Sequence, residues 1–225
     1  MKRSPVPLAA DSPTSILHAA LAELGSTERP TSMDDPTNNS ARRAHALWPG
    51  IVRQLLAQHP WNFAIARATL NVSGVAPTFG WQRRFALPAD CLRWLPGDPA
   101  HRSTERCERE GDTLVSNATA MTIRYIALVD DTTRWSPAFV QAAMLALAAA
   151  MAEGVTQSEG IKDRLLDRAA KAMRDAKRID GLETGATQRG GSVTRSSWLR
   201  ARSRGAYGGG YGAYDGHGYY GAGGE

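Results

Sequence analysis

Apolar residues recur at helical spacing in the stretch 44–56, which predicts a helix over residues 40–58. Pro49 and Gly50 fall inside that stretch and are expected to kink or divide the helix. From residue 81 to residue 125 the pattern changes to short alternating runs separated by turn residues. These runs predict a β-rich part over residues 61–128, folded as an antiparallel meander or a small barrel.

Two more helices are predicted after the β-rich part. Ser136 is suited to be an N-cap and Pro137 to lie in the first turn, so we expect an Ala-rich helix over 136–157. The next helix, over 158–179, has apolar residues on one face and alternating Lys, Arg and Asp on the other. Helices before and after a small sheet give an α+β fold: a helical bundle with a small antiparallel β-domain and extended terminal arms.

Aromatic residues concentrate where the first of these helices meets the β-rich part. His59-Pro60 ends the helical pattern, and the residues from Phe63 onward fit a strand or a short helix, with a strand favoured. Large aromatic side chains are usually buried. We therefore expect a structural core that contains Trp61, Phe63, Trp81, Phe85, Trp135 and Phe139.

The two ends of the chain differ in composition from its middle. Residues 1–39 are rich in Pro, Ser, Thr and Asp, and predict an arm with one short helix, capped by Ser12 and stopped at Gly25, followed by a linker. Residues 181–225 contain Arg and then become Gly/Tyr-rich, with too little apolar surface to fold alone. The predicted organisation is an N-terminal arm over 1–39, a core over 40–180 and an extended tail over 181–225.

Overall composition is that of a globular protein with a modest positive charge. The 225 residues are 42% hydrophobic and 22% charged, and the net charge is +5, which permits contact with nucleic acid without requiring it. Two cysteines are too few for a disulfide scaffold, which favours a reducing compartment. Prolines interrupt any secretory signal near the N-terminus. The longest uncharged apolar run, 137–152, is shorter than the roughly 20 residues of a membrane span, so no membrane partner is expected.

Candidate catalytic and metal sites are weak. The chain has none of the phosphate-loop, nucleotide-binding, nucleophile-elbow or zinc-protease motifs. Asp130-Asp131 is interpreted as a turn before the Ala-rich helix. A zinc site from Cys91, His101 and Cys107 lacks a fourth ligand at the usual spacing, so half-buried strand cysteines are favoured, and whether they pair stays open. The remaining histidines are isolated from one another: His18, His45, His59 and His217. We expect no enzymatic activity, no cofactor and no metal.

Nucleic-acid binding is the main alternative function. In a strand, Trp81, Arg83 and Phe85 share one face, which would offer aromatic rings for base stacking and a positive charge for phosphate. Burial of that aromatic face is the competing explanation, and it is favoured. The arginines of the tail, together with its Tyr and Gly, also resemble RNA-binding segments, although such tails equally serve as adhesive extensions. The alternative is therefore a cytoplasmic protein that uses this sheet face and an Arg-Gly-Tyr tail.

The Ala-rich helix favours a structural role rather than an enzymatic one. Seven of the twelve residues 141–152 are Ala, which favour helix but bury little apolar surface each. Such a helix forms a weak core on its own. We expect it to pack within a bundle or against other subunits, as in a structural component.

Several motifs occur in a specific order. They are L-L-x-x-H-P-W-N-F-A-x-x-R-A-x-L at 55–70, F-G-W at 79–81, R-F-x-L-P-A-D-C-L-R at 84–93, I-R-Y-I at 123–126, D-x-x-x-W-x-P-x-F at 131–139, and V-T-Q-S at 155–158. In this combination, over about residues 41–180, the chain resembles the tail tubular protein A, or head-to-tail adaptor, family of tailed bacteriophages. The N-terminal forty residues and the Gly-Tyr tail depart from the family's pattern.

The resemblance implies a virion structural protein without enzymatic activity. Members of the family join a helical bundle to a small β-domain and form a homo-oligomeric ring, commonly of twelve copies. The ring lies between the portal protein and the tail nozzle protein and surrounds the channel through which DNA passes without sequence-specific binding. We expect assembly in the host cytoplasm, a short tail, and a C-terminal part that reaches toward the portal. The tail residues expected at the portal or partner interface are Arg195, Trp198, Arg200, Arg202, Arg204, Tyr207 and Tyr211.

Overall fold

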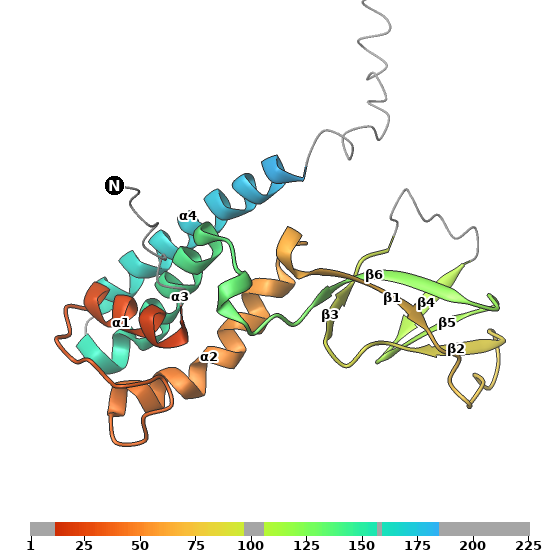
Figure 1. The fold of residues 1–225 in the computed structure, drawn as a ribbon, viewed down its shortest axis with the longest axis horizontal. Helices are drawn as coiled ribbons and strands as arrows, with labels where there is room; N and C mark the ends of the chain where they lie inside the picture. The colour runs from red at the N-terminus through yellow and green to blue at the C-terminus, as the bar shows by residue number, and fades with distance from the viewer. Residues whose placement is uncertain (1–11, 97–105, 157–158, 185–225) are drawn as a thin grey trace, which may run out of the picture. The chain divides into compact units, whose positions relative to one another are not determined.

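The computed structural model describes residues 12–96, 106–156 and 159–184, and these residues form a mixed α+β fold (Figure 1). Contacts divide the chain into two units, Met1–Gly185 and Ala186–Glu225. The predicted fold class is confirmed. The helices are α1 (Pro13–Glu23), α2 (Asn39–Ala57), α3 (Pro137–Thr156) and α4 (Glu159–Glu183), with 3-10 turns at Asn62–Ala64 and Thr132–Arg134.

Helix α1 belongs to the helical core and is not an arm. The Ser12 side chain accepts a hydrogen bond from Ser15 N at 3.1 Å, as expected of an N-cap, and Gly25 follows the helix with φ +73°. The apolar face of α1 is buried in a cluster shared with α2, α3 and α4. Met33, in the stretch expected to be a linker, joins the same cluster. Burial of these apolar side chains supplies the free energy that holds the segment against the bundle.

Helix α2 is continuous through Pro49, so the proline does not divide it. Asn38 caps the helix by accepting a hydrogen bond from Ala41 N at 2.9 Å. Beyond the proline, Val52, Leu55 and Leu56 are buried in the core. We infer that this burial outweighs the backbone hydrogen bond that a proline inside a helix removes.

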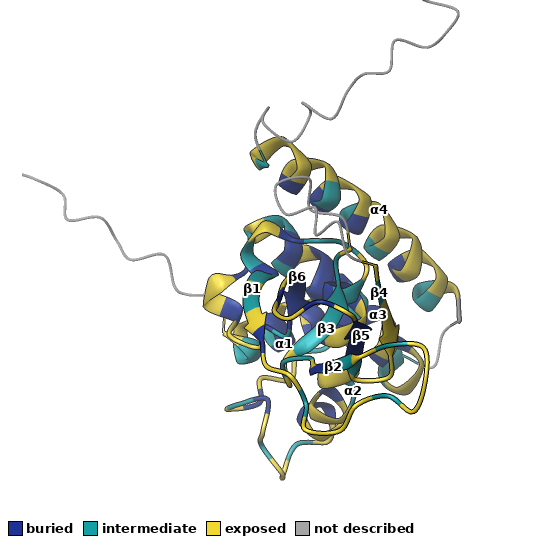
Figure 2. Cartoon of the chain, turned by 90° about the vertical axis from the view of Figure 1, so that its right-hand side faces the viewer, coloured by how far each residue is buried: buried dark blue, intermediate teal, exposed yellow. Residues whose placement is uncertain are grey.

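Helix α3 is the central helix of the bundle and contacts α1, α2 and α4. Its predicted N-cap is present, because Ser136 Oγ accepts a hydrogen bond from Phe139 N at 3.3 Å. By length and composition alone α3 could cross a membrane, yet 50% of its apolar window is buried inside the protein. Packing against three helices is enough to explain why it is so apolar. Figure 2 shows that α4, in contrast, is exposed along its outer face.

The strands form two antiparallel sheets of three strands each. The first has the order β1-β6-β3, from Ile65–Leu70, Met121–Ala127 and Cys91–Trp94. The second has the order β2-β5-β4, from Arg83–Ala86, Thr113–Ser116 and Cys107–Glu110. This order is not that of the predicted meander, since β6, the last strand, lies between β1 and β3. Strand β6 is buried at five of its seven positions, which suits the centre of a sheet better than an edge.

The two sheets share a core, and the residues that follow β1 pair with strand β2 of the other sheet. An isolated bridge pairs Val72 with Phe85, and Ser73 N donates to Arg84 O at 2.6 Å. Side chains of both sheets meet in one cluster that contains Leu70, Phe85, Leu114, Met121, Ile123, Tyr125 and Ala127.

An aromatic cluster joins the helices to the first sheet. The Trp61 and Phe139 rings meet edge to face with centroids 4.8 Å apart, and Trp135 and Phe139 do so at 4.9 Å. The indole N–H of Trp61 donates to Leu55 O at 3.1 Å, so its polar atom is satisfied inside the core. Phe63 packs on this cluster, and Phe85 is buried between the sheets. Trp81 is only partly buried and belongs to none of the three clusters found in the described residues, unlike the other five aromatic residues expected in the core.

Candidate interaction surface

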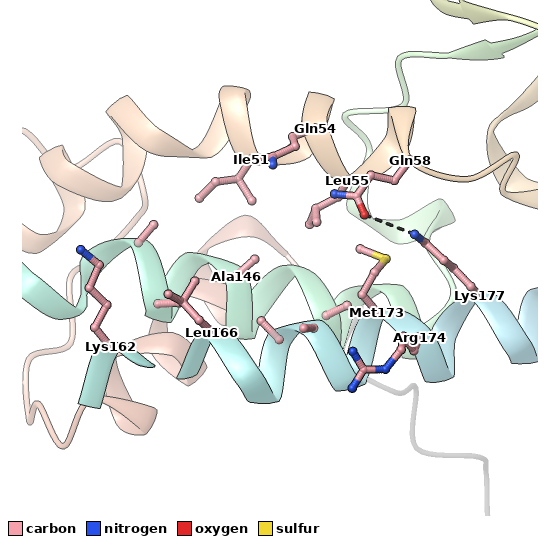
Figure 3. Close-up of a pocket in the computed structure, with 15 residues that line it drawn as sticks. Ile51, Gln54, Leu55, Gln58, Ala146, Lys162, Leu166, Met173, Arg174 and Lys177 are labelled. Carbon is pink, nitrogen blue, oxygen red and sulfur yellow. Dashed lines mark hydrogen bonds between the residues drawn. The ribbon is translucent and has the colours of Figure 1, made fainter. Parts of the chain in front are cut away.

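A groove of about 540 Å³ runs between α2 and α4, and its floor is formed by α3 (Figure 3). Small side chains create it. In a filled core, larger side chains would occupy this space. The floor and the α4 wall instead carry alanines: Ala142, Ala146, Ala149, Ala150, Ala169 and Ala170. The Ala-rich pattern of the sequence is the signal that leads to this groove, although the pattern does not tell which face stays open.

Larger apolar side chains also line the groove. Ile51 and Leu55 enter from α2, and Leu166 and Met173 from α4. Leu166 is 49% exposed, an unusual exposure for a leucine on the apolar face of a packed helix. The groove therefore presents an apolar surface that the described part of the chain leaves uncovered.

The rim of the groove is polar and positively charged. Gln54 and Gln58 lie on the α2 side, while Lys162, Arg174 and Lys177 follow one another along α4. Lys177 Nζ donates to Gln58 Oε1 at 3.3 Å across one end, and Lys162 pairs with Glu153 at 3.0 Å near the other. No acidic side chain is among the described residues that line the groove. The rim thus favours an apolar ligand that carries negative charge.

A polar cluster around the buried Asp180 side chain adjoins the Gln58–Lys177 end of the groove. Asp180 is 3% exposed, and its carboxylate is 3.0 Å from His59 Nε2 and accepts from Asn62 N at 2.9 Å. The Asn62 amide donates to Asp180 O at 2.8 Å, and the Thr184 hydroxyl lies 3.2 Å from Asn62 Oδ1. The cluster ties the last turns of α4 to the segment between α2 and β1. In the sequence His59 looks isolated, because its partner Asp180 follows more than a hundred residues later.

A second apolar surface is the loop between β1 and β2. Val72, Val75 and Phe79 are 50%, 67% and 86% exposed in this loop. The loop contains no charged residue from Asn71 to Trp81. A group of exposed large apolar side chains is typical of a surface that contacts another molecule. Phe79 belongs to the F-G-W motif at 79–81, but the sequence does not predict that these three side chains are exposed, since exposure is decided only by the fold.

Comparison of the chain with models of known protein families finds no match, and comparison with curated proteins finds none either. The family resemblance rests on the sequence motifs between residues 55 and 158.

The aromatic platform predicted for nucleic acid is not assembled as three exposed side chains. Phe85 is fully buried, so its ring cannot stack on a base. Arg83 Nη1 donates to Asn117 O at 2.8 Å and to Ala118 O at 3.1 Å, which engages its guanidinium within the fold. Trp81 is partly buried. The tail residues, Arg195, Trp198, Arg200, Arg202, Arg204, Tyr207 and Tyr211, lie outside the described residues.

The cysteines and the acidic pair have structural surroundings. Cys91 on β3 and Cys107 on β4 are free thiols that pack against the core between the sheets, and burial raises the pKa of both. His101 lies outside the described residues, among which no group of three metal-binding side chains occurs. Asp131 accepts hydrogen bonds from Thr133 N at 3.0 Å and Thr133 Oγ1 at 2.6 Å, and these bonds lower its pKa. The turn predicted at this position is confirmed.

Proposed function

We propose that the protein is a virion structural protein, a head-to-tail adaptor of a tailed bacteriophage. In this proposal it forms a ring of about twelve copies, the number that the resemblance implies, between the portal and the tail nozzle. The ring surrounds the channel through which DNA leaves the head. The role is geometric, and the protein carries out no reaction.

The observation that carries the proposal is the uncovered groove between α2 and α4. A ring requires a heterologous interface, in which one surface of each subunit meets a different surface of the next. The groove is one apolar surface, and the loop with Val75 and Phe79 is another on different elements. A subunit with two distinct exposed apolar surfaces on different elements can contact its neighbours in the ring through each of them.

Two measurements test the proposal. Mass by light scattering, with and without isolated portal rings, should show a closed ring at least in the presence of the portal, since such adaptors can stay monomeric until they meet a template. Electron microscopy of particles assembled without this protein should show heads that lack tails. Normally tailed particles would contradict the proposal.

The same preparations separate the proposal from the nucleic-acid alternative. An isolated chain that binds single strands with an affinity falling steeply with salt, and that builds no ring on the portal, would favour nucleic-acid binding.

A further inference from the structure

The groove between α2 and α4 needs an occupant, and the chain itself contains a segment that fits. We propose that the groove receives residues 205–225, here called the Gly/Tyr segment, of a neighbouring copy of the chain. The inference rests on the proposed function, because the neighbouring copy is the next subunit of the ring. The inference goes beyond the proposed ring because it names the surface of one subunit and the segment of the next that contact each other.

Charge is the first argument. The groove is rimmed by Arg174 and Lys177, together with Lys162, and no acidic residue lines it among the described residues. The Gly/Tyr segment contains Asp215 and Glu225 and no Lys or Arg. The stretch before it, 195–204, carries four Arg and would be repelled by the same rim. Complementary charge therefore selects the Gly/Tyr segment over the rest of the tail.

Side-chain size is the second argument. The floor and the α4 wall offer Ala methyl groups and the apolar side chains of Leu166 and Met173, a surface on which flat rings can lie. The Gly/Tyr segment holds five of the chain's six Tyr, separated mostly by Gly and Ala. Glycine lets a backbone approach a surface closely, and Tyr buries its ring while its hydroxyl reaches a polar partner. Gln54 and Gln58 on the α2 rim are such partners.

Chain length is the third argument. The described chain ends at Thr184, just after α4, whose residues 162–177 line the groove. The twenty residues 185–204 can span up to about 70 Å when extended. A helix of the length of α4, 25 residues, is about 37 Å long. The connection is thus longer than α4 itself, which lets the Gly/Tyr segment extend beyond its own groove toward another subunit.

Photo-crosslinking of the full chain tests the inference. Tyr214 is replaced by p-benzoylphenylalanine, and equal amounts of ¹⁵N-labelled and unlabelled protein are mixed, assembled on portal rings and irradiated. We expect cross-links from position 214 to peptides that contain Gln54, Gln58 or residues 162–177. Pairs of one labelled and one unlabelled peptide should be abundant, because donor and acceptor belong to different copies.

Two results would overturn the inference. Groove cross-links found only within one isotope would show that each chain fills its own groove. Cross-links to the loop 71–80, to the portal or to no defined place would show that the segment does not dock in the groove. Absence of a ring would instead contradict the proposed function, so the two failures are distinguishable.

Charge variants supply the matched control. Arg174→Glu should lower the groove cross-link yield by about threefold or more, because a rim cation becomes an anion facing Asp215 and Glu225. Lys171→Glu makes the same change on α4 at an exposed position that does not line the groove, and should leave the yield unchanged. Combining Arg174→Glu with Asp215→Lys should restore part of the yield. Equal losses in Arg174→Glu and Lys171→Glu would contradict docking in the groove.

Discussion

At the residue scale, the carboxylate of Asp180 holds two distant parts of the chain together. It lies buried at the end of α4 and is bonded to Asn62 N and His59 Nε2, which precede β1. A buried polar group is stable only when its hydrogen bonds are made, so removal of one partner leaves the others unsatisfied. Asp180 is therefore a positioning residue for the last turns of α4, next to the groove.

Asp180→Ala should lower the free energy of unfolding by about 1–3 kcal/mol, because it removes the buried carboxylate that accepts a hydrogen bond from Asn62 N and lies 3.0 Å from His59 Nε2. Asp180→Asn should cost less, since its amide oxygen can still accept that bond. Asp175→Ala, an exposed position on the same helix, should change the free energy by less than about 0.5 kcal/mol. Urea denaturation followed by circular dichroism measures all three, and equal stability of Asp180→Ala and Asp175→Ala would contradict the role of the cluster.

At the element scale, an ion pair connects the first and last helices of the bundle. Arg168 on α4 donates to Glu23 at the end of α1, with Nη2 and Oε1 3.0 Å apart. The hydrogen bond from Arg168 lowers the pKa of Glu23 below its ordinary value. The arrangement adds a polar tether to the apolar packing of α1 on α3.

The ion pair between Arg168 and Glu23 should make the free energy of unfolding rise as the pH rises. A carboxylate with a lowered pKa contributes stability above its ordinary pKa, about 4.3, and that contribution is lost as the pH falls through the folded-state value. Glu23→Gln should therefore be less stable than the native chain at pH 7, by at most about 1 kcal/mol because Arg168 is largely exposed. The difference should disappear in acid below the folded-state pKa and shrink at high salt.

Thermal unfolding of both chains between pH 3 and pH 7 measures this difference. Glu108→Gln, an exposed position on β4, is the control and should show little change. A difference between Glu23→Gln and the native chain that does not shrink between pH 7 and pH 3 would show that packing, not charge, is responsible.

At the scale of the whole molecule, the exposed loop between β1 and β2 is expected to contribute to ring assembly but not to folding. Phe79 is 86% exposed and belongs to none of the three core clusters of the described residues, so the fold does not depend on its ring. In the proposed ring, contact with another subunit would bury it. Its contribution should then appear only when copies meet.

Phe79→Ser should change the unfolding free energy of the chain by less than about 0.5 kcal/mol. It should raise the protein concentration needed for ring formation by about tenfold or more, because burial of a Phe side chain is worth about 1.5–3 kcal/mol. Thr78→Ala, on the same loop, should leave both quantities unchanged. Light scattering over a range of concentrations measures assembly, and an unchanged midpoint for Phe79→Ser would remove the loop from the interface.

Features that depend on residues close together in the chain can be predicted from the sequence. The caps at Ser12 and Ser136, the Ala-rich helix α3, most of the strands and the buried aromatic residues Trp61, Trp135 and Phe139 follow from local periodicity, capping and side-chain hydrophobicity. These act over a few residues and can be recognised without a fold. They are enough to predict the α+β class.

Features that join distant residues become visible only in the folded molecule. Strand β1 pairs with β6, α1 packs on α3, and Asp180 meets Asn62, all across long stretches of sequence. The exposure of Phe79 and the open groove beside α3 depend on what the rest of the chain covers. Hydrophobic periodicity shows that a face is apolar but not what lies against it, because burial is a property of the packed molecule.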